Sequence, residues 1–159
     1  MSLAGQEQTV DVRGEAASIY TGGRELSPDQ PATLFVHGAG MNHSVWAPIL
    51  QQLAAIDGNL IAVDLPGHGR STGEAINSIE AMADWLNDLV DNLGLDRVAL
   101  VGHSMGSLVA LDCAARYPQR IRALGLVGTS APMPVSQDLL DLAAANDPTA
   151  FEMLAEWGY

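Results

Sequence analysis

The segment Gly102-His103-Ser104-Met105-Gly106 carries the residue types and spacing that most directly indicate chemistry in this chain. A serine between two glycines favours a tight turn, because glycine leaves room where a Cβ would clash with neighbouring backbone. Where such a turn joins a strand to a helix, the hydroxyl is lifted clear of the sheet as a nucleophile. The next backbone N–H, that of Met105, then lies at a helix N-terminus, where developing negative charge is stabilised.

The residues on either side of this turn predict the strand and the helix. Arg97–Val101 is short, apolar and β-branched, which is typical of a buried parallel strand. Ser107–Arg116 places apolar residues at helical spacing. A serine that merely caps a helix would give the same short pattern, so a second motif is needed to decide between the two interpretations.

That second motif lies upstream, where the apolar run Thr33–Val36 leads into a loop that begins with His37 and Gly38. We expect this loop to direct a second backbone N–H, that of Ala39, toward the same point as the N–H of Met105. Two donors converging on one oxygen would stabilise a tetrahedral oxyanion by a few kcal/mol. An ordinary loop with a buried, hydrogen-bonded histidine is the alternative interpretation of this segment.

Together with the stretch Leu60–Ser71 (LIAVDLPGHGRS), these motifs resemble the α/β-hydrolase superfamily in order and spacing, over roughly residues 30–131. The resemblance implies an α/β fold with a mostly parallel sheet and helices on both faces. It implies an esterase-like serine hydrolase in which Ser104 attacks a small carboxylic ester and Ala39 and Met105 supply the oxyanion N–H groups. The branches that hydrolyse haloalkanes and epoxides are similar but carry aspartate at the elbow. Supporting roles in the elbow and the loop fall to His37, Gly38, Gly102, His103 and Gly106.

The resemblance also implies that the catalytic acid and histidine are absent from this chain. In the family both residues follow the nucleophile, and the histidine comes near the C-terminal end. All four histidines of this chain, His37, His43, His68 and His103, precede Ser104. We therefore expect the N-terminal portion of an α/β-hydrolase fold that lacks its last strands and helices, and little turnover by this portion alone.

A different class of function follows from the same observations. Without a base, the chain could be a catalytically inactive α/β-hydrolase-like module for binding or assembly. The predicted strand Ile121–Val127 would then form an open sheet edge, suited to a homo-oligomer or to a complementing chain.

The remaining elements are predicted from periodicity and turn residues. Asn77 and Glu80 predict a capped helix start, and Gly94 predicts its end. We divide the chain into an incomplete hydrolase core, residues 1–131, and the start of a helical lid, residues 132–159. The other expected elements are a hairpin of Thr9–Val12 and Ala17–Tyr20, a helix over about 45–56, and helices from Ser136 and Asp147.

Composition narrows the possible partners. The chain has 159 residues, 48% of them hydrophobic, and a formal charge of −12, which argues against nucleic acid and anionic membranes as partners. A single cysteine, Cys113, excludes an intrachain disulfide and is expected to pack as a small apolar residue. Residues 1–6 resemble no secretory signal, so a cytoplasmic location is expected. No cofactor or metal is predicted: Gly67 and Gly69 lack the third glycine of a dinucleotide fingerprint, and the elbow has no phosphate-loop lysine.

Overall fold

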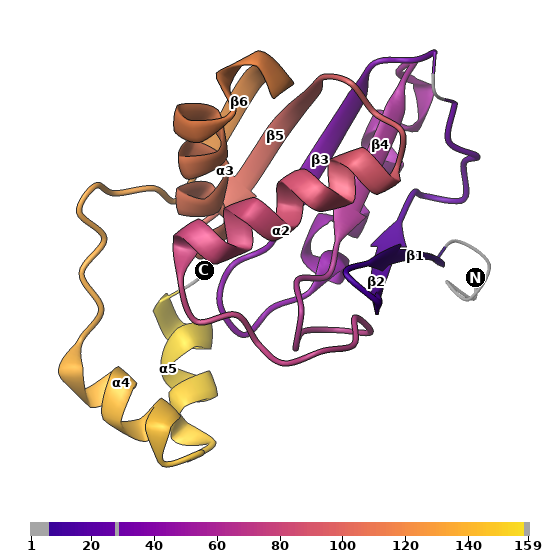
Figure 1. Ribbon diagram of the computed structural model, residues 1–159. Helices are drawn as coiled ribbons and strands as arrows, with labels where there is room; N and C mark the ends of the chain where they lie inside the picture. Colours follow the sequence, from indigo (N-terminus) through magenta and orange to yellow (C-terminus); the bar gives the residue numbers. More distant parts are fainter. Residues whose placement is uncertain (1–6, 28, 158–159) are drawn as a thin grey trace. The chain divides into compact units, whose positions relative to one another are not determined.

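The apolar, β-branched runs of the chain assemble into one six-stranded sheet in the order β1-β2-β4-β3-β5-β6 (Figure 1). The computed structural model describes residues 7–27 and 29–157, so the segment examined for a secretory signal lies outside the described residues. The strands are β1 Glu7–Val12, β2 Glu15–Tyr20, β3 Ala32–Val36, β4 Asn59–Val63, β5 Val98–His103 and β6 Ile121–Val127.

The sheet is parallel where the functional motifs lie. β3 pairs in parallel with β4 on one side and β5 on the other, and β5 pairs in parallel with β6. The β1–β2 hairpin adds the two antiparallel pairings. Because parallel strands end at the same edge, the loop after β3 and the turn after β5 are brought together.

Helices cover both faces of the sheet, as expected for this fold class. α2 (Ile79–Asn92) and α3 (Met105–Arg116) pack against one face, where Leu34, Val36 and Leu100 belong to the larger core. α1 (Ala47–Gln52) contributes to a second core on the opposite face. That second core consists of Tyr20, Phe35, Trp46, Ala47, Leu50, Leu60 and Ala62.

Two details of the helices differ from the prediction. Ser78, rather than Asn77, caps α2, and its hydroxyl accepts a hydrogen bond from the Ala81 N–H at 3.2 Å. The segment expected as one helix over about 45–56 is divided into the 3-10 turn η2 (His43–Trp46), α1, and the 3-10 turn η3 (Leu53–Ala55).

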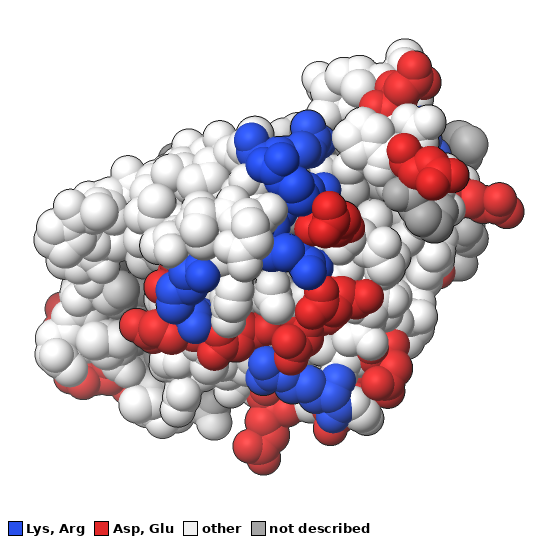
Figure 2. Space-filling model, turned by 45° about the horizontal axis from the view of Figure 1, so that its top comes forward, with Lys and Arg blue, Asp and Glu red and all other residues white. Residues whose placement is uncertain are grey.

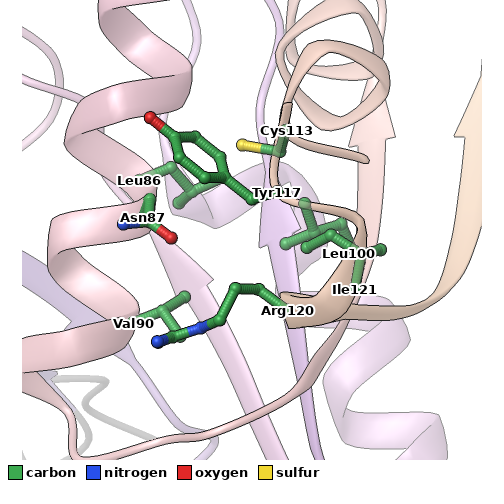
Figure 3. A pocket seen from close by; sticks show the side chains of 8 residues that line it. All are labelled: Leu86, Asn87, Val90, Leu100, Cys113, Tyr117, Arg120 and Ile121. Atoms are coloured by element: carbon green, nitrogen blue, oxygen red, sulfur yellow. The ribbon is translucent and has the colours of Figure 1, made fainter. Parts of the chain in front are cut away.

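Cys113 is buried between α2 and α3 (Figure 3), in agreement with the prediction that it packs as a small apolar residue. Its thiol donates to the Ala83 carbonyl at 3.4 Å. Leu86 and Val90 of α2 lie on one side of the small cavity beside it, and Leu100 of β5 lies on the other. Burial raises the pKa of this thiol to about 12.

Arginines from three other segments pair with the acidic face of α2. Arg13 reaches Asp88 at 2.5 Å, and Arg120 reaches Asp91 at 2.5 Å. Arg116 of α3 contacts Asp84 at 2.5 Å. Figure 2 shows basic side chains lying beside acidic ones on the face that it draws, and no broad basic patch there.

β6 forms one edge of the sheet and is exposed on both faces. Its partner β5 lies on one side only. Leu124, Leu126 and Val127 are 38%, 41% and 48% exposed, respectively. An edge strand with apolar side chains leaves both backbone hydrogen-bonding groups and apolar surface available for another strand.

The described part of the chain divides into two compact units, one that ends at Thr129 and one that begins at Ser130. This second unit contains α4 (Gln137–Ala144) and α5 (Thr149–Trp157). Ser136 caps α4, because its hydroxyl accepts from the Leu139 N–H at 3.2 Å. None of the helices in the described ranges is long and apolar enough to cross a membrane.

Candidate active site

Ser104 occupies a sharp turn between the end of β5 and the start of α3. Its backbone angles are φ 52° and ψ −120°, a region that residues with a Cβ rarely adopt. The turn is held from both sides: the Ser104 N–H donates to the Val127 carbonyl at 2.9 Å, and the Ser104 carbonyl accepts from the Ser107 N–H at 2.9 Å. The strand and the helix that the sequence predicts therefore meet at this serine.

Two glycines make this turn possible because each lies against backbone. A Cβ on Gly102 would lie 2.2 Å from the Gly106 carbonyl oxygen, and a Cβ on Gly106 would lie 2.4 Å from the Val36 carbonyl oxygen. Both distances are far below van der Waals contact. The close approach of α3 to β3 depends on Gly106, and the tight entry into α3 depends on Gly102.

The loop after β3 lies directly against the elbow. A Cβ on Gly38 would be 3.1 Å from the His103 Nδ1 and 3.3 Å from the Ser104 Cβ. Ala39 follows in the same loop and is half-buried, as are Ser104 and Met105. The structure thus brings together the two segments to which the sequence assigns the nucleophile and the oxyanion donors.

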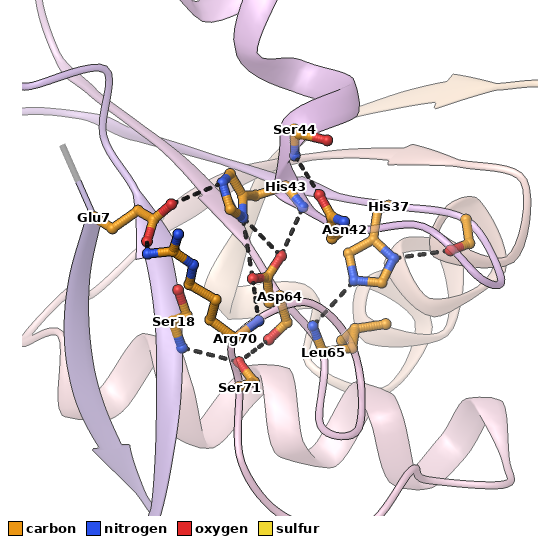
Figure 4. A network of polar contacts seen from close by, with 11 residues as sticks. Glu7, Ser18, His37, Asn42, His43, Ser44, Asp64, Leu65, Arg70 and Ser71 are labelled. Carbon is orange, nitrogen blue, oxygen red and sulfur yellow. Dashed lines mark hydrogen bonds and ion pairs between the residues drawn. The ribbon is translucent and has the colours of Figure 1, made fainter. Parts of the chain in front are cut away.

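His37 is fully buried at the end of β3, and both of its ring nitrogens are hydrogen-bonded (Figure 4). Its Nε2 accepts from the Leu65 N–H at 3.1 Å, and its Nδ1 donates to the Gly38 carbonyl at 2.8 Å. Burial lowers the pKa of His37 to about 4, so the ring is neutral at pH 7. His37 therefore holds the loop and has no nitrogen with which to serve Ser104 as a base.

His43 lies in a network of polar side chains that no sequence motif indicates (Figure 4). Its Nδ1 donates to the Asp64 carboxylate at 2.9 Å, and its Nε2 lies 3.4 Å from the Glu7 carboxylate. The Tyr20 ring stacks on the imidazole with a centroid distance of 5.4 Å. Arg70 completes the network through an ion pair with Glu7.

This network fixes the loop that follows β4. The buried Asp64 carboxylate accepts from the His43 N–H at 2.6 Å and from the Arg70 N–H at 2.9 Å. A Cβ on Gly69 would lie 2.1 Å from the Asp64 Oδ2, so the turn closes around the carboxylate. The network therefore holds this loop in place, and the two ring nitrogens of His43 face the carboxylates of Asp64 and Glu7.

The two remaining histidines are placed differently. His68 is half-buried: its ring lies 5.0 Å from that of His37, and its Nδ1 donates to the Pro66 carbonyl at 3.0 Å. His103 packs between Gly38 and Gly128. Within the described ranges, no hydrogen bond joins the Ser104 hydroxyl to a histidine or a carboxylate, and no group of three or more histidine, cysteine or acidic side chains is arranged to hold a metal.

Known proteins resemble this chain in both sequence and structure. The sequence profile of the α/β-hydrolase fold family matches residues 31–159. An uncharacterized protein of Mycobacterium tuberculosis is 41% identical over 98 residues, which are 61% of this chain and 28% of that protein. The pimeloyl-[acyl-carrier protein] methyl ester esterase of Klebsiella pneumoniae is 39% identical over 97 residues, 61% of this chain and 36% of the esterase.

Among solved structures, a thermophilic esterase superposes with a TM-score of 0.73 at 31% identity. The superposition covers 94% of this chain and 54% of the esterase chain. This chain spans well under half the length of the two curated relatives named above, 28% and 36% respectively. The elbow between β5 and α3, the mostly parallel sheet and the match of the family profile lead to one conclusion: this chain belongs to the α/β-hydrolase family.

Proposed function

We propose that this chain carries the nucleophile and the oxyanion-binding half of a serine hydrolase site for small carboxylic esters. The observation that carries the proposal is the backbone of Ser104, held at φ 52° at the N-terminus of α3 and against the loop of Gly38. Strain of this kind persists only where surrounding structure enforces it, and it concentrates at functional sites. Ester specificity is supported by the similarity to a methyl ester esterase and to a thermophilic esterase.

In the proposed reaction the Ser104 Oγ bonds to the acyl carbon and its proton passes to a base. The carbonyl oxygen becomes an oxyanion that accepts hydrogen bonds from the Ala39 and Met105 N–H groups. The ester C–O bond then breaks, the base returns its proton to the leaving oxygen so that the alcohol departs, and water later hydrolyses the acyl-enzyme. All histidines of these 159 residues precede Ser104, so the proposal assigns the base of the triad to a group outside them.

The test supplies that base as added imidazole. Purified chain and its Ser104→Ala variant are incubated with p-nitrophenyl acetate, with and without imidazole, and acetylation of the protein is followed by intact mass spectrometry. We expect imidazole-dependent acetylation of Ser104, located by peptide mapping, and none at that peptide in Ser104→Ala. Equal acetylation of the two proteins would remove Ser104 from the mechanism.

A fluorophosphonate probe gives an independent readout, since it also requires a nucleophilic serine. Labelling that disappears in Ser104→Ala supports the proposal. Labelling that persists in the variant contradicts it.

The second candidate is a binding or assembly module, and the exposed β6 edge favours it. Such a module would associate through β6 and show no acylation that depends on Ser104. Sedimentation velocity of the chain beside a Leu126→Lys variant tests it: association lost in the variant supports the module, whereas a monodisperse monomer in both proteins contradicts it.

A further inference from the structure

The two hydrogen bonds of His37 select one protonation state of its ring. A backbone N–H can only donate, so the Leu65 N–H requires a lone pair on Nε2. The carbonyl of Gly38 can only accept, so Nδ1 must carry the proton. The neutral Nδ1–H tautomer alone satisfies both partners; a proton on Nε2 would face the Leu65 N–H.

The position of the Leu65 N–H is itself fixed by the loop after β4. Leu65 follows Asp64, whose buried carboxylate is held by the N–H groups of His43 and Arg70 at 2.6 and 2.9 Å. The Ser71 hydroxyl donates to the Asp64 carbonyl at 2.6 Å. The network around Asp64 thus fixes the position of the Leu65 N–H, which holds the His37 ring through Nε2. The same ring holds the loop after β3 through the bond from Nδ1 to the Gly38 carbonyl.

The Gly38 carbonyl links the His37 ring to the loop beside Ser104. It accepts from the His37 Nδ1 at 2.8 Å and from the Met41 N–H at 3.3 Å. A trans peptide is planar and carries its C=O and N–H on opposite sides. Fixing the Gly38 oxygen therefore fixes the direction of the Ala39 N–H, which donates to no acceptor within the described part of the chain.

Gly38 also lies against the nucleophile, since a Cβ built on it would be 3.3 Å from the Ser104 Cβ. We propose that His37, as the Nδ1–H tautomer, is a positioning residue that aims the Ala39 N–H at the oxyanion formed on Ser104. The inference rests on the proposed function, because it assigns the orientation of one of the two oxyanion donors. His37 acts through the peptide and does not touch the substrate.

The first measurement needs no variant and no activity. Long-range ¹H–¹⁵N correlations of the imidazole rings at pH 7 identify which nitrogen of His37 carries the proton. We expect the proton on Nδ1. A proton on Nε2, or on both nitrogens, would overturn the proposal.

The second measurement separates positioning from folding. Acetylation of Ser104 by p-nitrophenyl acetate in imidazole is measured against ester concentration for the wild type, His37→Phe and His37→Asn. The Phe variant lacks the donor to Gly38, and we expect its maximal rate to fall about 10- to 100-fold at an unchanged half-saturating ester concentration. The Asn variant places an amide N–H close to the position of Nδ1, and we expect it to recover most of the rate.

His68→Phe is the matched control, because the His68 ring lies 5.0 Å from the His37 ring but bonds Pro66 and not Gly38. We expect it to acetylate at the wild-type rate. A His37→Phe variant as fast as the wild type, or an equal loss in His68→Phe, would overturn the positioning role.

Failure of the proposed function is recognised separately. If acetylation of the wild type does not depend on Ser104, the esterase proposal fails, and the amide signal of Ala39 decides the role of His37. A shift of that signal in His37→Phe, absent in His68→Phe and largely reversed in His37→Asn, supports control of the peptide by His37. An unmoved Ala39 signal contradicts it.

Discussion

At the scale of single residues, Ser104 combines the hydroxyl that we propose as the nucleophile with an unfavourable backbone conformation. A residue with a Cβ at φ 52° costs on the order of 1–3 kcal/mol relative to an unstrained position. Glycine relieves that cost because it has no Cβ. A serine at this position therefore lowers stability, and under the proposed function its hydroxyl is the reason why glycine does not replace it.

We expect Ser104→Gly to raise the free energy of unfolding by about 1 kcal/mol while abolishing acylation. Urea titration monitored by tryptophan fluorescence measures the gain. Ser104→Ala is the matched control: it removes the hydroxyl but keeps the Cβ, so it should show no comparable gain. Equal stability of the Gly and Ala variants would contradict backbone strain at the elbow.

His37 makes stability depend on pH. Its pKa is lowered from the usual 6.5 to about 4 in the folded protein, chiefly by burial. Between these two values the unfolded chain binds a proton that the folded chain does not, so stability falls as pH falls through this range. The contribution is fully present above pH 6.5 and amounts to about 3 kcal/mol.

Urea titrations at pH 7 and pH 4.5 of the wild type and of His37→Asn measure this contribution. Carboxylates titrate in both proteins, so the difference between the two pH dependences isolates His37. We expect the wild type to lose more stability than the variant. A variant with the same loss would show that His37 does not titrate on unfolding.

The residues of the elbow could be predicted from the sequence because they are contiguous and their spacing carries a steric reason. The partners of His43 could not be predicted in this way. Glu7 and Asp64 lie on different strands or strand ends, and only the folded sheet brings them to one imidazole. The roles of His37 likewise depend on Leu65, which adds a backbone N–H that no side-chain pattern reveals.

At the scale of elements, the reactivity of one buried cysteine measures how firmly α2 and α3 pack together. Cys113 is buried, its thiol bonds the Ala83 carbonyl of α2, and burial raises its pKa to about 12. Only the thiolate reacts rapidly with disulfide reagents. Reaction therefore requires α3 to separate from α2.

We expect Cys113 in the native protein at pH 8 to react with an aromatic disulfide reagent at least about 100-fold more slowly than in urea-unfolded protein. Absorbance of the released thiolate measures the rate. A Cys113→Ala variant gives the background. Native and unfolded rates within a few-fold of one another would mean that the two helices separate readily.

The strands and the elbow helix follow from apolar periodicity, whereas helix limits depend on local details. Pro48 lacks a backbone N–H and fits best in the first turn of a helix, so α1 begins at Ala47 and the preceding turn is 3-10. Ser78 and Asn77 are both good capping residues. Which of them caps α2 depends on the residue at which helical backbone angles begin, and the sequence pattern does not determine that residue.

At the scale of the whole molecule, negative charge exceeds what the arginines can neutralise. The chain carries 19 acidic and 7 basic residues. Arg13, Arg70, Arg116 and Arg120 are paired with carboxylates in the folded protein. The excess of like charge opposes compaction, and salt screens it.

We expect the thermal midpoint to rise by about 2–4 °C between 10 and 200 mM NaCl, because relief of repulsion outweighs screening of exposed pairs. Circular dichroism melts over this range provide the measurement. An Arg116→Gln variant is the control: it adds one unit of net negative charge and removes pairs, so its midpoint should rise more steeply with salt. A midpoint that falls with salt in both proteins would show that the ion pairs dominate.

The position of β3 in the sheet has a consequence for synthesis on the ribosome. Its residue Ala32 pairs with Asn59 on one side and with Val98 on the other. At a translation rate of about 5–20 residues per second, roughly 3 to 13 seconds separate the appearance of β3 from that of β5. During that interval the edge of β3 that pairs with β5 has no partner, and the apolar side chains of β3 are incompletely covered. The loop of His37 likewise has no elbow against which to pack. The nascent chain therefore passes through a stage suited to chaperone binding, which ends when β5 and the segment of Ser104 leave the exit tunnel.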